Sequence, residues 1–284
     1  MKVNNNNNYN VTHKAGLTTQ MKRQIRSCNV QKVNAEFSRY GIPTNFKDNK
    51  IIAWSSFKCL QIIQTLNSKY NLNLALPNGI FVEDFANLDI PDDQNLLGFC
   101  TTIPSPFLKN SKKMFPGKTI FFNRYPDKDC SDKSFTWNNI SVIADYKKEV
   151  GDSSTNHFLE IIFHEFAHAI HFDHLSKILN KNDYLRLLVK LEEMDKNGSF
   201  KKKYLKTISK ESCIYAGTNP MESVACDLSK RILSSLDEYK LRPLENFTEN
   251  SPYREHCFEE TFLSKIFDKK YDRLIRRFWN GNIK

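Results

Sequence analysis

The sequence lacks several features that would place the chain in a membrane or in the secretory pathway. Its seven cysteines form no Cys-x-x-Cys pair and cannot all be bridged to one another, which favours a reducing compartment with free thiols. No run approaches eighteen consecutive apolar residues, so we expect no membrane span. The asparagine-rich start lacks the apolar core of a signal peptide. These absences predict a cytoplasmic protein, although one exported without a signal peptide would share them.

Charge is unbalanced toward the positive side, with 42 lysines and arginines against 32 acidic residues and a formal net charge of +10. Such an excess can favour acidic protein surfaces, anionic membranes or nucleic acid. The basic residues are spread along the chain, and short clusters at 201–203 and 269–277 are typical of solvated helix faces. We therefore expect an acidic or mixed protein partner, and no specific nucleic-acid binding.

Apolar periodicity and turn residues predict a mixture of helices and strands without internal repeats. Residues 1–25 are polar and predicted to be disordered, and one domain is expected over 26–284. The expected helices are 51–66, 183–196, 220 to about 236 and 252–279, and the expected strands are 72–76, 79–82, 119–125 and 141–146. Residues 85–117, with their four prolines, are expected to form a long loop-rich insertion, and a polar loop is expected up to residue 210.

Residues 164–174 read His-Glu-Phe-Ala-His-Ala-Ile-His-Phe-Asp-His and contain an HExxH pattern. Because an α-helix turns once in about 3.6 residues, His164 and His168 project from one face and can bind one metal ion. Glu165 is rotated off that axis and is the candidate general base toward a zinc-bound water, whose pKa is roughly 7. The flanks are apolar nearly all round, which predicts a buried helix in which unpaired histidines would be costly. The alternative is an exposed helix whose histidines face water.

A catalytic zinc usually has three protein ligands and a water, so a third ligand is needed. His174 lies six residues after His168, the spacing of the HExxHxxGxxH pattern of metzincins. However, His171 stands where that pattern has the glycine that makes the turn. Neither Met194 nor Met221 lies in a recognisable turn of the kind metzincins place under the metal.

Glu222 is the other candidate for the third ligand. Asn219 is a good N-cap and Pro220 suits the first helical position, so a helix is expected to begin here. Small side chains at Ala225 and Cys226 would let this helix pack closely against the HExxH helix and present the Glu222 carboxylate to the metal. The alternative is a capping box, in which Glu222 only reaches back to the Asn219 amide.

The segments HEFAHAIH and YAGTNPMESVA resemble the gluzincin metallopeptidases, the group that includes the anthrax lethal factor catalytic domain, the Mlc titration factor peptidases and the Pro-Pro endopeptidases. The resemblance implies that one zinc ion per chain is bound by the residues aligned with the family's ligands, His164, His168 and Glu222. It further implies Glu165 as the base and Tyr215 as a hydrogen-bond donor to the oxyanion.

The resemblance covers residues 157–236 and implies an α+β, zincin-like fold. It predicts a small mixed sheet, a buried HExxH helix and a mostly helical C-terminal lobe, with an upper lobe of about 50–175 and a lower lobe of about 176–284. The strand at 141–145 is then the candidate edge for an extended substrate, although it could equally be an internal strand.

Two positions depart from the family pattern. Cys226, with Asp227 beside it, stands where lethal factor has an acidic residue, and His171 stands where the relatives commonly have aspartate. The polarity around the metal ligands is therefore expected to differ from that of the relatives.

We expect a monomeric zinc metalloendopeptidase that cleaves a protein or peptide, of a toxin or effector type that would act in its own cytoplasm or in a host cytosol. The alternatives are a non-catalytic zinc-binding interaction module on a protease scaffold and a basic, nucleic-acid-associated protein. Retention of Glu165 and Tyr215 argues against a module that only holds metal. No residue is assigned to substrate binding, because relatives differ even in cleavage preference.

Overall fold

The computed structural model describes residues 17–88, 96–106, 109, 112–125, 137–140, 159–238 and 270–283. The helices are α1 (Thr19–Arg26), α2 (Val30–Arg39), α3 (Lys50–Tyr70), α5 (Glu160–Ile178), α6 (Lys181–Asn197), α7 (Ser199–Glu211), α8 (Pro220–Glu238) and α10 (Lys270–Trp279), with 3-10 turns η1 (Phe85–Asn87), η3 (Trp137–Asn139) and η4 (Tyr215–Gly217). The strands are β1 (Thr44–Asn45), β2 (Gly79–Glu83), β3 (Gly98–Cys100) and β4 (Thr119–Asn123). No helix in these ranges combines the length and the apolar character that a membrane crossing needs.

The four strands form one small mixed sheet in the order β1-β2-β4-β3. Strands β1, β2 and β4 are parallel, and β3 is antiparallel to β4 at one end of the sheet. Side chains alternate between two apolar faces, as strand geometry requires. One face packs with α3 and α5 through the side chains of Ile80, Val82, Ile120 and Phe122. On the opposite face, three aromatic rings stack across the strands: Phe81, Phe99 and Phe121. Apolar side chains therefore pack on both faces of the sheet.

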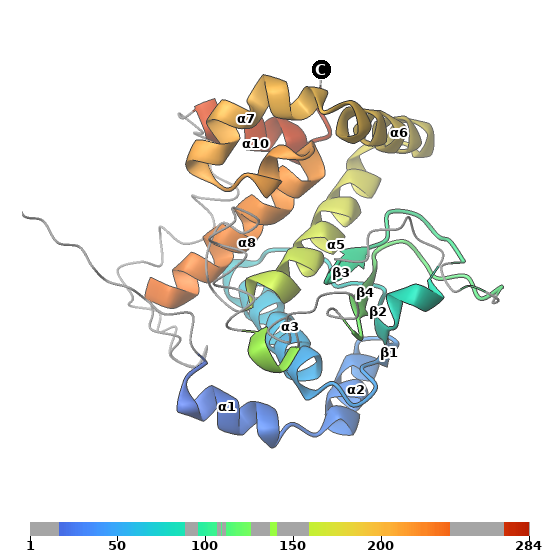
Figure 1. The fold of residues 1–284 in the computed structure, drawn as a ribbon, viewed down its shortest axis with the longest axis vertical. Helices are drawn as coiled ribbons and strands as arrows, with labels where there is room; N and C mark the ends of the chain where they lie inside the picture. Colours follow the sequence, from blue (N-terminus) through green and yellow to red (C-terminus); the bar gives the residue numbers. More distant parts are fainter. Residues whose placement is uncertain are drawn as a thin grey trace, which may run out of the picture.

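Helix α5 lies at the centre of the molecule and α8 packs along it (Figure 1). The first half of α5 contacts α3 and the sheet, and the second half of α5 contacts α6 and α10. On α8, the small residues Ala225 and Ser229, on the face that carries Glu222, are completely buried. Small side chains at these positions allow close packing of the two helices, and the predicted burial of the HExxH helix is confirmed.

Much of the predicted secondary structure is confirmed. The structure contains the helices predicted at 51–66, 183–196 and 220–236, the strands predicted at 79–82 and 119–125, and the 270–279 part of the C-terminal helix. The fold class is α+β with a small mixed sheet, as expected. The strand predicted at 141–146 and residues 252–269 of the C-terminal helix lie outside the described residues.

The strand predicted at 72–76 is wrong. The Asn67 side chain on α3 donates to the Leu74 carbonyl at 2.9 Å and accepts from the Leu74 amide at 2.8 Å. Both backbone groups of Leu74 are thus bonded to a side chain instead of a neighbouring strand. The disorder predicted up to residue 25 is also wrong from residue 19 onward, because α1 is capped by Thr18 and buries Ile25.

The polar loop predicted up to residue 210 is helix α7. Gly198, with φ of +61°, separates α6 from α7, and such a left-handed conformation suits glycine. Phe200, Tyr204 and Ile208 recur at intervals of four residues and are buried in the helical cluster with α10. The predicted loop-rich insertion at 85–117 likewise contains a short strand, β3.

An ion-paired aspartate connects helix α5 to the sheet. Asp173 on α5 accepts from Lys118, next to β4, at 2.6 Å and from Lys177 at 2.7 Å. Burial raises the pKa of the Asp173 carboxyl, but the hydrogen bonds and charges of the two lysines outweigh this effect and hold the pKa below its usual value. The Lys118 backbone has φ of +65°, a left-handed conformation that is unfavourable for residues other than glycine.

We predict that Asp173→Asn lowers the free energy of unfolding by about 1–3 kcal/mol at neutral pH, because charged hydrogen bonds to a partly buried carboxylate are lost. Since the folded pKa is depressed, this stabilisation is present above about pH 4 and disappears as pH falls further. Denaturant unfolding of both proteins at neutral and acidic pH measures the difference.

The control Glu192→Gln removes an exposed pair with Lys196 and is expected to change stability by less than about 0.5 kcal/mol. A deficit for Asp173→Asn that persisted unchanged at acidic pH would contradict the ion-pair explanation.

Candidate metal centre

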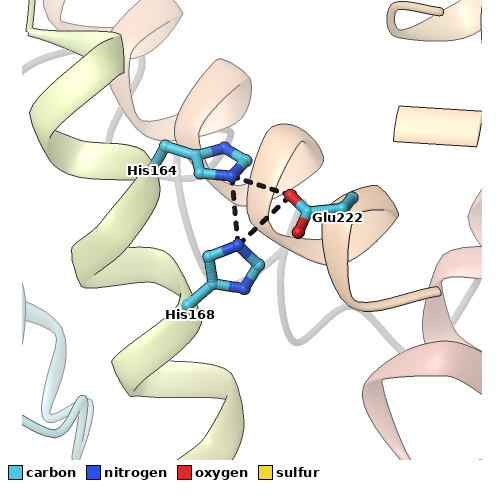
Figure 2. A group of neighbouring side chains, drawn as sticks. All are labelled: His164, His168 and Glu222. Atoms are coloured by element: carbon cyan, nitrogen blue, oxygen red, sulfur yellow. Dashed lines mark hydrogen bonds and ion pairs between the residues drawn. The ribbon is translucent and has the colours of Figure 1, made fainter. Parts of the chain in front are cut away.

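Three potential metal ligands from two helices converge on one point (Figure 2). The Nε2 atoms of His164 and His168, on successive turns of α5, lie 3.0 Å apart. The Oε2 atom of Glu222 on α8 lies 2.9 Å from His164 Nε2 and 3.2 Å from His168 Nε2. Among the described residues these three alone form a group of metal-ligating type and spacing. The predicted convergence of the two imidazoles and the carboxylate is present.

The spacing of the three atoms fits a tetrahedral zinc site. Zinc–nitrogen bonds of about 2.0–2.1 Å at tetrahedral angles separate two ligand atoms by about 3.3 Å. The separations of 2.9 to 3.2 Å are only slightly shorter, so small side-chain shifts suffice for binding. Two imidazole nitrogens and one carboxylate oxygen are also a donor set that zinc favours in catalytic sites. The donor set by itself does not distinguish zinc from other divalent transition metals.

The start of α8 orients Glu222. The Asn219 side chain accepts from the amides of Met221 at 2.9 Å and Glu222 at 3.0 Å, so Asn219 is the predicted N-cap. The Glu222 carboxylate points at the imidazoles, which argues against the capping-box alternative. Burial raises the pKa of this carboxyl, but attraction and hydrogen bonds from His168 and His164 outweigh burial and hold the pKa well below its ordinary value. Glu222 is therefore an anion at neutral pH.

Glu165 is a buried carboxylate beside the three ligands. Its Oε2 atom has no hydrogen-bond partner among the described residues. Burial raises the pKa of Glu165 to about 7, with His164 opposing the shift and the negative charge of Glu222 adding to it. A carboxyl group with a pKa near 7 can both accept and release a proton at neutral pH.

The opposite side of the His164 ring faces a thiol. Its Nδ1 lies 3.8 Å from the Sγ of Cys226, one helical turn after Glu222. Asp227, the neighbour considered in the sequence, instead forms an ion pair with Arg231 at 2.8 Å. A sulfur atom, and not a carboxylate, therefore faces this ring nitrogen.

Tyr215 lies next to the ligand group. It begins η4, and its ring centre is 5.9 Å from that of His164 at an interplanar angle of 48°. The side chain is half-buried. Its nearness to His164 is compatible with the predicted role, since a phenol here can donate a hydrogen bond to a reacting group above the ligands.

The other two histidines of α5 face away from the ligand group, toward α10. His174 Nε2 lies 3.1 Å from Asn280 Oδ1 and its ring stacks on Trp279 at 4.2 Å, so the alternative in which His174 is the third ligand is wrong. His171 is completely buried, and its Nε2 lies 3.2 Å from the carbonyl oxygens of Phe278 and Trp279. Burial, reinforced by His168, lowers the pKa of His171 to about 3, so the ring is neutral and donates to these carbonyls.

Strand β3 is a feature of the site that the sequence analysis missed. This strand packs against α5. Burial raises the pKa of its Cys100 thiol, and the negative charge of Glu165 raises it further, so Cys100 lies near the candidate base. Three residues are too few for an alternating apolar pattern, so no sequence signal identified this strand.

Comparison with known proteins found no matching family model, no similar curated protein and no similar solved structure.

We predict that the protein binds one zinc ion and that Glu222→Gln weakens binding by more than about 100-fold, because the anionic ligand is lost. His174→Ala serves as the control and is expected to keep wild-type affinity, since His174 contacts α10. Competition with a chromophoric zinc chelator measures both affinities. Equal weakening by the two substitutions would point to a general disturbance of α5.

Proposed function

We propose that this protein is a zinc metalloendopeptidase of the gluzincin type that hydrolyses a protein or peptide. The observation that carries the proposal is the approach of His164, His168 and Glu222 to within 3.2 Å of one another, at the spacing that tetrahedral zinc requires. Glu165 and Tyr215 lie beside this group in positions compatible with the two remaining roles. Membership of the zincin fold and the identity of the metal are parts of the proposal.

His164, His168 and Glu222 would hold the metal, which supplies Lewis-acid activation of water and of the scissile carbonyl when bound. Glu165 takes a proton from the attacking water while the water oxygen adds to the carbonyl carbon. Tyr215 donates its hydroxyl hydrogen to the negative charge that develops on the carbonyl oxygen. Glu165 then delivers the proton to the leaving nitrogen as the C–N bond breaks.

An extended peptide could pair with β3 in this proposal. Strand β3 ends the described sheet, lies along α5 and brings Cys100 near Glu165. Addition of a strand to a sheet edge binds peptides through main-chain hydrogen bonds. The candidate substrate edge in this proposal is therefore residues 98–100; the other candidate, 141–145, lies outside the described residues.

The non-catalytic zinc module remains the alternative from another class. It accounts for the three ligands but gives no reason for a buried glutamate whose Oε2 is unpartnered among the described residues. Zinc binding without peptide cleavage by the wild type would favour that alternative. Cleavage that depends on Glu165 would exclude it.

We predict that Glu165→Gln reduces peptide cleavage by at least about 10³-fold while zinc affinity stays within a few-fold of wild type, because the amide cannot accept the proton of water. Cleavage of a diverse peptide library, followed by mass spectrometry, measures activity without knowledge of the substrate. The isosteric control Glu193→Gln, on the exposed face of α6, is expected to keep full activity. Equal cleavage by wild type and Glu165→Gln would reject the mechanism.

We predict that Tyr215→Phe lowers kcat by about 10²–10³-fold with little change in KM, because one donor to the oxyanion is removed. Zinc affinity is the internal control and is expected to stay at the wild-type value, since Tyr215 is not among the ligands. A rise in KM at unchanged kcat would assign Tyr215 to substrate binding instead.

A further inference from the structure

A buried serine connects the two parts of the chain that carry Tyr215 and Glu222. Ser223 follows Glu222 on α8 and is completely buried. Its hydroxyl donates to the carbonyl oxygen of Ala216, the residue that follows Tyr215 in η4. The same hydroxyl lies 3.2 Å from the carbonyl oxygen of Asn219, at the start of α8. The Ser223 side chain therefore joins η4 to the first turn of the helix that carries the carboxylate ligand.

Hydrogen bonds on both sides of Ala216 fix this turn. The Ala216 amide donates to the Sγ of Cys213 at 3.4 Å, while the Ala216 carbonyl accepts from Ser223. Within the turn, the amide of Thr218 donates to the Tyr215 carbonyl at 2.9 Å. Ala216 itself is completely buried. Both backbone groups of the residue next to Tyr215 are thus bonded to side chains that lie outside η4.

The bond from Ser223 closes a short loop of chain. It spans seven positions, and Glu222 lies inside the span while Tyr215 borders it. The Tyr215 ring centre is 5.9 Å from that of His164, so the loop brings the phenol and the carboxylate to the same group of ligands. The position of the phenol relative to the ligands therefore depends on the geometry of this loop.

We propose that Ser223 is a positioning residue, which restrains η4 so that the Tyr215 hydroxyl meets the oxyanion that develops during peptide hydrolysis. The role of the hydroxyl rests on the proposed function. The restraint on η4 does not, because it depends only on the hydrogen bonds of Ser223. Ser223 acts on the reaction only through Tyr215.

The contribution of a phenol depends on where its hydroxyl lies. A donor stabilises an oxyanion at a distance of about 2.7–3.1 Å, and a misplacement of about 1 Å can cost about 100-fold in rate. Removing the Ser223 hydroxyl takes a donor from the buried Ala216 carbonyl and loosens η4. The Tyr215 hydroxyl then occupies its productive position less often. Glu222 keeps its place, because the Asn219 cap still holds the start of α8.

We predict that Ser223→Ala lowers kcat about 10–100-fold and leaves KM and zinc affinity within about three-fold of wild type. Cleavage of a peptide taken from a diverse library measures kcat and KM, and a chromophoric chelator measures zinc affinity. The matched control is Ser229→Ala, the same substitution at another completely buried serine of α8, whose hydroxyl has no hydrogen-bond partner among the described residues. This control is expected to keep the wild-type kcat.

A double-mutant cycle separates positioning from a general weakening of the fold. In the Tyr215→Phe background no hydroxyl is left to position, so Ser223→Ala is expected to change kcat by less than about three-fold. A full additional loss in that background would show that Ser223 acts by another route, and would overturn the proposal. A marked fall in the zinc affinity of Ser223→Ala would also overturn it, since the effect would then lie on the metal ligands.

Amide hydrogen exchange of the full chain, followed by mass spectrometry, tests the restraint without any activity. We expect peptides that cover residues 213–219 to exchange about ten-fold faster in Ser223→Ala than in wild type, and Ser229→Ala to exchange like wild type. Unchanged exchange in Ser223→Ala would reject the restraint on η4. If the wild type cleaves no peptide, the proposed function and the Tyr215 step fail together, whereas exchange still decides whether Ser223 restrains the turn.

Discussion

The contact between α5 and α8 is the constraint on which the rest of the site depends. His164 and His168 are fixed relative to each other by one helix, but Glu222 reaches them only because α8 lies directly against α5. Small residues on α8 make this approach possible, and the Asn219 cap sets where α8 begins. A larger side chain in the contact would separate the carboxylate from the imidazoles without altering any of the three.

This arrangement concentrates polar groups in an apolar interior. Glu165 Oε2 and His168 Nδ1 are buried without hydrogen-bond partners among the described residues, and each such group costs about 1–3 kcal/mol. The surrounding apolar clusters, built from the sheet and α3 on one side and from α6, α7 and α10 on the other, supply the compensating burial. A bound cation would also stabilise the folded state, because an unfolded chain does not assemble the ligands.

The sequence predicts the parts of this site that depend on local periodicity. The spacing of His164 and His168 and the Asn219-Pro220 helix start each follow from a few neighbouring residues, and the structure contains both. The approach of Glu222 was predicted from small residues and a family resemblance, since nothing local determines which helices meet. The contacts that were missed are formed by long-range packing or by single side chains, such as Asn67 on the Leu74 backbone or the buried face of α7. The position of β3 against α5 has no signature in sequence spacing.

The attachment of α10 to α5 has a consequence for the order of events during synthesis. His171 and His174 bond to residues that lie 106 to 108 positions later in the chain. While residues 278–280 are still inside the ribosome, the second half of α5 is without its stacking partner Trp279 and the two histidines are exposed to water. The helix that carries His164 and His168 thus reaches its final packing only after translation has passed α10, so a nascent chain would complete the surroundings of its candidate metal ligands late.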